Sequence, residues 1–183
     1  MDINDRIYDK SIDRLRSDER VSRLEINKVI DYCLKGSKLN SILDVGTGSG
    51  LFAEAFASKG IIVSGIDLNE KMIDEAKIYL PESEFKVGVA EAIPYDKDSF
   101  DASFYGLVFH EVSDYKKALS EAYRVSHFYT FLLEWKFKVE EFGPPIEHRL
   151  KSEFIKNLSN ESGYKKFTEI PLANLVLYRL DKN

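Results

Sequence analysis

The sequence predicts a doubly wound α/β fold, in which a mostly parallel sheet of seven strands carries helices on both faces. Three observations support this class. Short apolar segments alternate with amphipathic ones, as in parallel sheets covered by helices. The first apolar segment runs into a glycine-rich turn that opens a helix. The last two strands have no crossover helix between them, so at least one of them runs antiparallel.

The 183 residues fit one domain, with a helical arm or lid at 1–37 and an α/β core at 38–183. The arm is dense in charge from Tyr8 to Arg23, and Tyr8 is either a surface residue or a candidate to close over a bound ligand as a lid. A more regular helix follows and ends near Gly36. Its apolar face has helical spacing and comprises Ile26, Val29, Ile30, Cys33 and Leu34.

The core elements are predicted from apolar runs and from the residues that end or cap each run. Pro81 ends one predicted helix, Gly60 follows another, and Asp114 is placed to cap a third. The predicted strands are Ser41–Val45, Ile61–Ile66, Phe85–Val89, Asp101–Tyr105, Phe128–Lys136, Phe167–Ile170 and Leu175–Leu180. The predicted helices are Leu51–Ser58, Glu70–Leu80, Tyr115–Val125 and Ser152–Asn160.

Composition excludes several classes of protein. The net charge of -5 and a pI of about 5.3 argue against a nucleic-acid partner, which would require clustered Lys and Arg. The single cysteine, Cys33, excludes an internal disulfide and a zinc cluster, so we predict no metal site. The charged N-terminus does not read as a signal peptide, and no apolar run is long enough to span a membrane. We therefore expect a cytoplasmic protein.

The turn after the first strand, Gly46–Thr47–Gly48–Ser49–Gly50, predicts a ligand site at a helix N-terminus. Its spacing is G-x-G-x-G, and Leu51 stands where a dinucleotide-binding motif has its third glycine, which disfavours a diphosphate ligand. Asp67 ends the second strand, where an acidic side chain suits a pair of ribose hydroxyls. The pattern indicates a nucleoside without a phosphate chain.

Two stretches carry a family resemblance. ILDVGTGSGLFAEAFASKGIIVSGIDLNEKMIDEAK (Ile42–Lys77) resembles the first two motifs of class I S-adenosylmethionine-dependent methyltransferases. VGVAEAIPYDKDSFDASFYGLVFHEV (Val87–Val112) resembles the third and fourth motifs of their small-molecule branch, which includes ubiquinone and menaquinone methyltransferases. The resemblance covers residues 40–136 and implies a Rossmann-like core with S-adenosylmethionine as cofactor and S-adenosylhomocysteine as product.

The resemblance also implies roles for individual residues. The turn Gly46–Thr47–Gly48 would lie under the methionine part of the cofactor, with Gly50 completing it, and Asp44 would hold the ammonium group. Asp67 would bind the ribose hydroxyls. Around the rest of the cofactor the implied contacts are Leu68 on the adenine face, Ala90 and Glu91 at the adenine edge, and Tyr105 and Gly106 near the reactive methyl group.

The sequence departs from the family pattern at two places. Val89 replaces an acidic residue that accepts a hydrogen bond from the adenine amino group, and such a bond contributes roughly 0.5–1.5 kcal/mol. The segment RVSHFYTFLLEW (Arg124–Trp135) lacks the usual Lys-Pro-Gly-Gly turn before the fifth strand. We expect the first departure to affect cofactor affinity. We expect the second to affect the structure at the edge of the fold more than the chemistry.

Acceptor-side candidates follow the fourth and fifth strands. His110 and Glu111 come directly after the fourth strand, where a base or a substrate contact is expected. Glu134 lies within the fifth strand, and we expect it to reach solvent at the strand end. A loop stiffened by two prolines leads to His148 and Arg149, which are candidates for contact with a polar or anionic substrate.

These features favour a methyltransferase that acts on a small molecule by in-line displacement at the methyl carbon. Three alternatives remain at this stage. They are a non-catalytic S-adenosylmethionine-binding regulatory or accessory protein, a methyltransferase that acts on a protein or RNA, and a nicotinamide oxidoreductase. The sequence leaves the acceptor and the oligomeric state undetermined.

Overall fold

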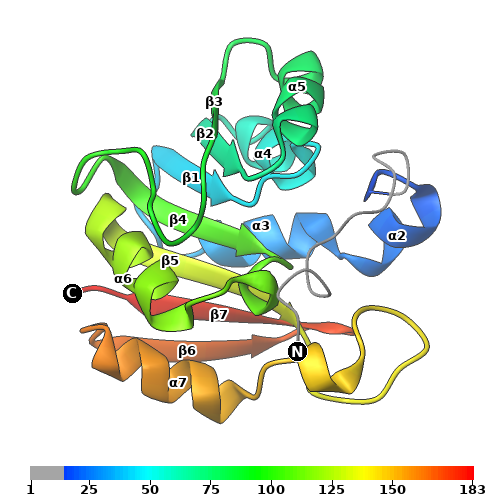
Figure 1. Ribbon diagram of the computed structural model, residues 1–183, viewed down its shortest axis with the longest axis vertical. Helices are drawn as coiled ribbons and strands as arrows, with labels where there is room; N and C mark the ends of the chain where they lie inside the picture. The colour runs from blue at the N-terminus through cyan, green and yellow to red at the C-terminus, as the bar shows by residue number, and fades with distance from the viewer. Residues whose placement is uncertain (1–14) are drawn as a thin grey trace.

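The structure is a computed structural model, and it describes residues 15–183 (Figure 1). Within that range the strands form one sheet of seven in the order β3-β2-β1-β4-β5-β7-β6. β7 runs antiparallel to both of its neighbours, and the other pairings are parallel. The predicted fold class is confirmed. The strands are β1 (Ser41–Val45), β2 (Ile62–Asp67), β3 (Glu84–Val87), β4 (Phe100–Gly106), β5 (Ser126–Trp135), β6 (Lys166–Pro171) and β7 (Leu175–Asp181).

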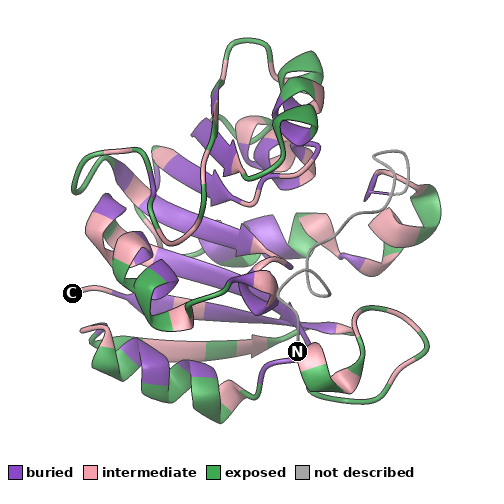
Figure 2. Ribbon diagram, in the orientation of Figure 1, coloured by how far each residue is buried: buried purple, intermediate pink, exposed green. Residues whose placement is uncertain are grey.

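Helices cover both faces of the sheet. One apolar cluster joins the sheet to α3, α4 and α5, and a second joins its other face to α6 and α7. In Figure 2 the central strands are largely buried and the edge strand β6 is intermediate or exposed, while α6 and α7 show alternating buried and exposed residues. The helices are α2 (Asp18–Arg23), α3 (Ile26–Leu34), α4 (Leu51–Ala57), α5 (Glu70–Tyr79), α6 (Tyr115–Val125) and α7 (Ser152–Glu161).

Local sequence signals account for the helix starts. Asn69 caps α5 by accepting a hydrogen bond from the backbone N–H of Lys71. Asp114 caps α6 by accepting from the N–H of Lys117, as its position predicts. Both caps lie just beyond the carboxyl end of the sheet, so they fix the loops that surround the site.

Two strand boundaries differ from the predictions by two residues, and the others differ by one residue or none. β3 ends at Val87, not at Val89, because the chain turns there: the N–H of Gly88 donates to the carbonyl of Asp67, and Val89 forms a short bridge with Ala92. β5 begins at Ser126, directly after α6, and the N–H of Ser126 still donates to a helix carbonyl. In place of the missing Lys-Pro-Gly-Gly turn, α6 therefore leads directly into β5 with no loop between them.

The carboxyl ends of β1, β2, β4 and β5 lie at one edge of the sheet, and α2 and the loop 136–150 lie at the same edge (Figure 1). The arm or lid at 1–37 stays a prediction, and Tyr8 lies outside the described residues. The described part of the arm contains α2 and α3, separated by Glu25 in a left-handed conformation. The arm is therefore placed at the edge where a ligand is expected.

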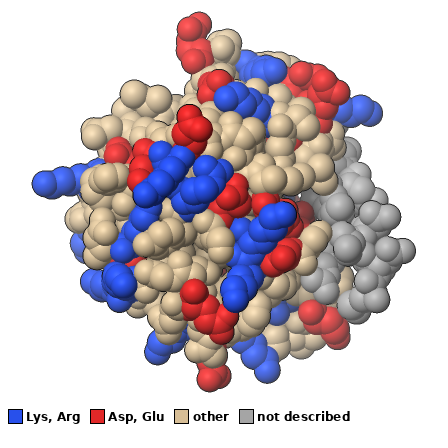
Figure 3. Space-filling view, turned by 60° about the vertical axis from the view of Figure 1, so that its left-hand side comes forward, with Lys and Arg blue, Asp and Glu red and all other residues tan. Residues whose placement is uncertain are grey.

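Acidic and basic side chains are interspersed on the face drawn in Figure 3, with no single sign covering it. None of the helices in residues 15–183 is long and apolar enough to cross a membrane.

Candidate functional site

The glycine turn bends sharply between β1 and α4. Gly46, Gly48 and Gly50 all have positive φ, at 68°, 54° and 78°. Thr47 anchors the turn, since its N–H donates to the carbonyl of Ile66 at 2.9 Å. A Cβ at Gly46 would lie 2.5 Å from a methyl carbon of Val108, so this glycine is required both by its φ and by a neighbouring side chain. The absence of a side chain at Gly46 thus lets Val108 pack against the turn, and it also leaves the backbone accessible to a ligand.

Asp44 is buried beneath this turn. Its carboxylate accepts a 2.8 Å hydrogen bond from the hydroxyl of Thr47 and is 1% exposed. Burial raises the pKa of Asp44 to about 7, and the nearby charge of Asp67 adds to the rise. The ionised form of Asp44 is costly here, and a cation placed beside the carboxylate would favour that form and lower its pKa.

Asp67 connects the end of β2 to the glycine turn. One carboxylate oxygen accepts from the N–H of Gly48 at 2.8 Å, and the other accepts from the N–H of Asn69 at 2.9 Å. Burial raises the pKa of Asp67 against the opposing effect of these two bonds. The carboxylate is therefore fixed in direction before any ligand arrives.

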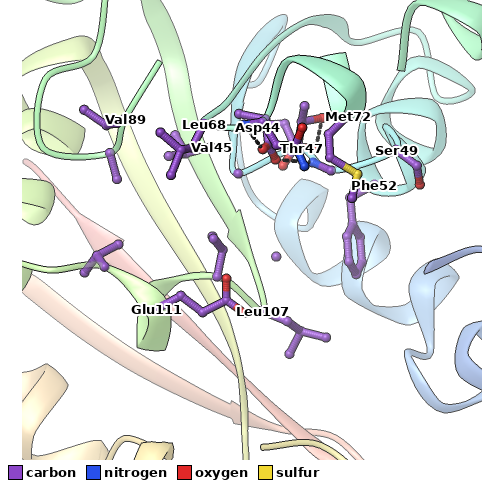
Figure 4. A pocket seen from close by; sticks show the side chains of 18 of the residues that line it. Asp44, Val45, Thr47, Ser49, Phe52, Leu68, Met72, Val89, Leu107 and Glu111 are labelled. Atoms are coloured by element: carbon purple, nitrogen blue, oxygen red, sulfur yellow. Dashed lines mark hydrogen bonds between the residues drawn. The ribbon is translucent and has the colours of Figure 1, made fainter. Parts of the chain in front are cut away.

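These groups surround a cavity of about 260 Å³ at the carboxyl edge of the sheet. In Figure 4 the Asp44–Thr47 pair forms one wall, Phe52 and Met72 stand to one side, and Val89 and Leu68 to the other. Glu111 directs its carboxylate toward the middle of the cavity from the wall opposite Asp44. The predicted cofactor residues in the lining are Asp44, Gly46, Thr47, Gly48, Asp67, Leu68, Ala90, Glu91 and Gly106.

Two predicted cofactor residues lie behind the lining. Gly50 is the N-cap of α4 and packs against Ala76. Tyr105 is fully buried, and its hydroxyl donates to the carbonyl of Ala118 at 3.2 Å. Its side chain therefore belongs to the core beneath α6, and the adjoining Gly106 is the part of this strand end that reaches the cavity.

The segment after β3, where the sequence predicts contacts with adenine, forms one wall of the cavity. Val89, Ala90 and Glu91 all line the cavity. The Glu91 carboxylate accepts hydrogen bonds from the N–H groups of Ser113 and Asp114, at 2.7 and 3.2 Å. Glu91 thus fastens this segment to the start of α6.

On the acceptor side, His110 is paired with Glu134 in the interior. Nδ1 of His110 lies 2.8 Å from one carboxylate oxygen, and the backbone N–H of His110 donates to the other at 3.1 Å. Glu134 is 1% exposed, so the expectation that it reaches solvent is wrong. The reason is a partner 24 residues away that satisfies the buried carboxylate.

The other two acceptor-side candidates belong to the loop 136–150. His148 closes the short 3₁₀ helix Ile146–His148 and is half-buried outside the cavity lining. Arg149 is buried and donates to the carbonyls of Lys136, Phe142 and Pro144, at 2.6–3.0 Å. It also pairs with Glu140 at 3.2 Å. Its guanidinium thus holds the loop together, and a substrate contact stays a prediction for both residues.

Sequence reasoning did not single out the arm residues that close the cavity. Leu15 and Arg20 line it, and a Cβ at Gly48 would meet Leu15 at 3.5 Å. Arg16 fastens the arm: it pairs with Glu54 at 2.8 Å and donates to the carbonyl of Ser49 at 2.7 Å. Its guanidinium also stacks on a tyrosine of α5. No motif marks these residues, although their proximity to the glycine turn makes them part of the site.

Comparison with known proteins agrees with this geometry. Residues 43–127 match the family described as methyltransferase domain. This segment contains the end of β1, the glycine turn, Asp67, the Val89–Glu91 segment and the loop after β4. Residues 43–127 therefore carry a methyltransferase domain, and the chain resembles class I S-adenosylmethionine-dependent methyltransferases.

Individual relatives have low sequence identity to this chain, and the alignments cover only part of each curated relative. The chain is 34% identical over 103 residues to a demethylmenaquinone methyltransferase of Renibacterium salmoninarum, covering 56% of this chain and 44% of that protein. It is 32% identical over 152 residues to the methyltransferase YcgJ of Bacillus subtilis, covering 75% and 57%. The chain therefore spans about half the length of these relatives. The crystal structure of an S-adenosylmethionine-dependent methyltransferase from Aquifex aeolicus superposes with a TM-score of 0.80 at 22% identity, over 100% of both chains.

Proposed function

We propose that this methyltransferase binds S-adenosylmethionine in the cavity and transfers its methyl group to a small molecule by in-line displacement. One observation carries the proposal: Asp44 and Asp67 flank a single glycine turn within one cavity. The relatives named as demethylmenaquinone methyltransferases support a small acceptor. The sulfonium of the bound cofactor supplies an electrophilic methyl group.

The residues of this chain fit the cofactor in three ways. The Asp44 carboxylate, buried with a raised pKa, suits an ammonium group. Asp67 is held by two backbone N–H groups and has oxygen lone pairs left for two hydroxyls. Glycines leave the backbone of the turn uncovered for the methionine part.

On the adenine side, Leu68 is 57% exposed and offers an apolar face, while Ala90 and Glu91 form the edge of the cavity. Val89 offers no hydrogen-bond acceptor on its side chain, so adenine recognition there depends on backbone groups. Positioning of the acceptor in line with the methyl carbon is the main catalytic contribution expected from the protein, and such positioning lowers barriers by ~7–11 kcal/mol in the best cases.

The test is calorimetric binding of S-adenosylmethionine and S-adenosylhomocysteine to the protein and to an Asp67→Ala variant. Loss of charge-assisted bonds to the ribose, worth ~1.5–3 kcal/mol, should weaken binding by tenfold or more. Asp74→Asn, an exposed position on α5, is the control and should bind like the wild type.

Unchanged affinity in Asp67→Ala would show that the ribose assignment is wrong. Binding of NADH without binding of S-adenosylmethionine would favour a nicotinamide enzyme. Binding without methyl transfer to any member of a quinone-precursor panel would favour an accessory role.

A further inference from the structure

The buried pair of His110 and Glu134 lies next to the cavity wall and is connected to it. Nε2 of His110, the ring nitrogen that does not face Glu134, lies 3.8 Å from a carboxylate oxygen of Glu111. Glu111 lines the cavity and points into it (Figure 4). Three titratable groups therefore run in sequence from the cavity into the interior: Glu111, His110 and Glu134.

The environment of His110 suits a group that accepts a proton. Burial alone would lower its pKa, but the charge and the hydrogen bond of Glu134 outweigh burial, and the pKa is raised from its usual 6.5. Glu111 acts in the same direction, and Arg149 from the neighbouring loop opposes it. The hydroxyl of Tyr115 on α6 donates to the backbone carbonyl of His110 and fixes this segment.

A buried carboxylate that binds Nδ1 of a histidine orients the ring and stabilises its protonated form, leaving Nε2 to exchange a proton. Glu134 makes this contact and also holds the backbone N–H of His110, so ring and backbone are fixed together. A purely structural pair would not require the second ring nitrogen to face a carboxylate at the cavity wall.

We propose that Glu111, His110 and Glu134 form a proton relay, and that the methyl acceptor is consequently a protic nucleophile, a hydroxyl or an amine. This inference rests on the proposed function. Glu111 is the catalytic residue that meets the acceptor, and His110 and Glu134 are positioning residues behind it. The relay leads away from the site through side chains that are almost fully buried.

The step balances as follows. The acceptor oxygen or nitrogen forms a bond to the methyl carbon as the bond from that carbon to sulfur breaks, and sulfur keeps the electron pair. The acceptor proton passes to the Glu111 carboxylate and then to Nε2 of His110, where Glu134 stabilises the resulting imidazolium. General base assistance of this kind contributes typically 10²–10⁴-fold to the rate.

The first test needs neither cofactor nor acceptor. The pKa and tautomer of His110 are measured by ¹⁵N NMR of the imidazole in the full chain, with His110→Gln to assign the signal. We expect a proton fixed on Nδ1, a titrating Nε2, and a lower pKa in both Glu134→Gln and Glu111→Gln. A His110 pKa that does not change in Glu111→Gln would overturn the relay, whether or not the protein binds S-adenosylmethionine.

The second test compares two ring compounds as acceptors with S-adenosylmethionine: phenol, which loses a proton on methylation, and pyridine, which does not. With phenol the rate should rise with pH through the His110 pKa and fall ~100-fold in Glu111→Gln and Glu134→Gln. With pyridine, which has no proton to lose, these variants should lose much less rate than with phenol. Glu153→Gln, exposed in the first turn of α7, is the control and should match the wild type with both.

Equal losses with both compounds would assign the buried pair a structural role only. Transfer to pyridine but not phenol, or to neither by a protein that binds the cofactor, would overturn the protic acceptor. Recovery of the phenol rate in Glu111→Asp, which keeps the carboxylate, would add support.

Discussion

At the residue level, two positions that share a backbone conformation have different surroundings. Gly46 and Gly36 have φ of 68° and 67°, but a Cβ at Gly46 would collide with Val108 while a Cβ at Gly36 would meet open space. A non-glycine residue with positive φ costs ~1–2 kcal/mol at either position. Only at position 46 does the new Cβ also overpack its surroundings, which costs a further ~1–3 kcal/mol.

We therefore predict that Gly46→Ala lowers the free energy of unfolding by ~1–3 kcal/mol more than Gly36→Ala does. Urea unfolding of both variants provides the measurement. Adding Val108→Ala to Gly46→Ala should recover part of the difference, because the colliding methyl groups are removed. Equal losses in the two single variants would contradict the steric account.

Asp44 gives a pH-dependent prediction. Its folded-state pKa of about 7 lies above its ordinary value of 3.8, so it favours folding below pH 4 and this contribution is lost as the pH rises to 7. Relative to Asp44→Asn, the wild type should lose roughly 2–4 kcal/mol of stability between pH 4 and pH 8, at 1.36 kcal/mol per pKa unit. Denaturant unfolding at several pH values measures this difference in the free energy of unfolding. The corresponding difference between the wild type and Asp74→Asn should not change with pH.

At the level of elements, Arg16 links the described part of the arm to the site. Arg16 contacts Glu54 of α4, the glycine turn at Ser49 and Tyr79 of α5, and its neighbour Leu15 closes the cavity. Arg16→Ala should therefore weaken S-adenosylhomocysteine binding by roughly threefold to tenfold, the loss of one or two hydrogen bonds. Lys59→Ala removes an exposed ion pair between α3 and the turn after α4, and it should leave the affinity unchanged.

Calorimetry of both variants measures the effect. Equal affinity in Arg16→Ala and the wild type would show that the arm does not contribute to the cofactor site.

The sequence predicted most elements because each carries its own local signal. The apolar face of α3 and the Asp114 cap depend on residues within a few positions of one another. The start of β5 was missed because no residue separates it from α6, and an apolar run alone does not show where a helix becomes a strand.

The candidate site residues also divide into those with a signal in the local sequence and those without one. Asp44, Asp67 and the glycines could be assigned from spacing, since they lie at strand ends on either side of one turn. The pairing of Glu134 with His110 and the contacts of Arg149 depend on the tertiary fold. Neither follows from spacing along the chain.

At the level of the whole molecule, the single cysteine reports on global opening. Cys33 is fully buried in the cluster between α3 and the sheet, away from the cavity lining, and burial raises its pKa well above the usual range. Its reaction with a thiol reagent should therefore require the fold to open. S-adenosylhomocysteine at 100 times its Kd stabilises the folded state by ~2.7 kcal/mol and should slow the reaction ~100-fold.

The reaction rate with 5,5′-dithiobis(2-nitrobenzoate), with and without S-adenosylhomocysteine, is the measurement. A rate that the ligand does not change would mean that α3 detaches locally while the site stays intact.

The loops after β1 and β4 interlock. Val108 occupies the space that a side chain at Gly46 would need, and Phe52 does the same at Gly106. Reshaping residues 107–113 to accept new substrates will therefore carry a penalty in cofactor affinity. Directed evolution of substrate range has more freedom in the segment 137–148, which lies outside the cavity lining.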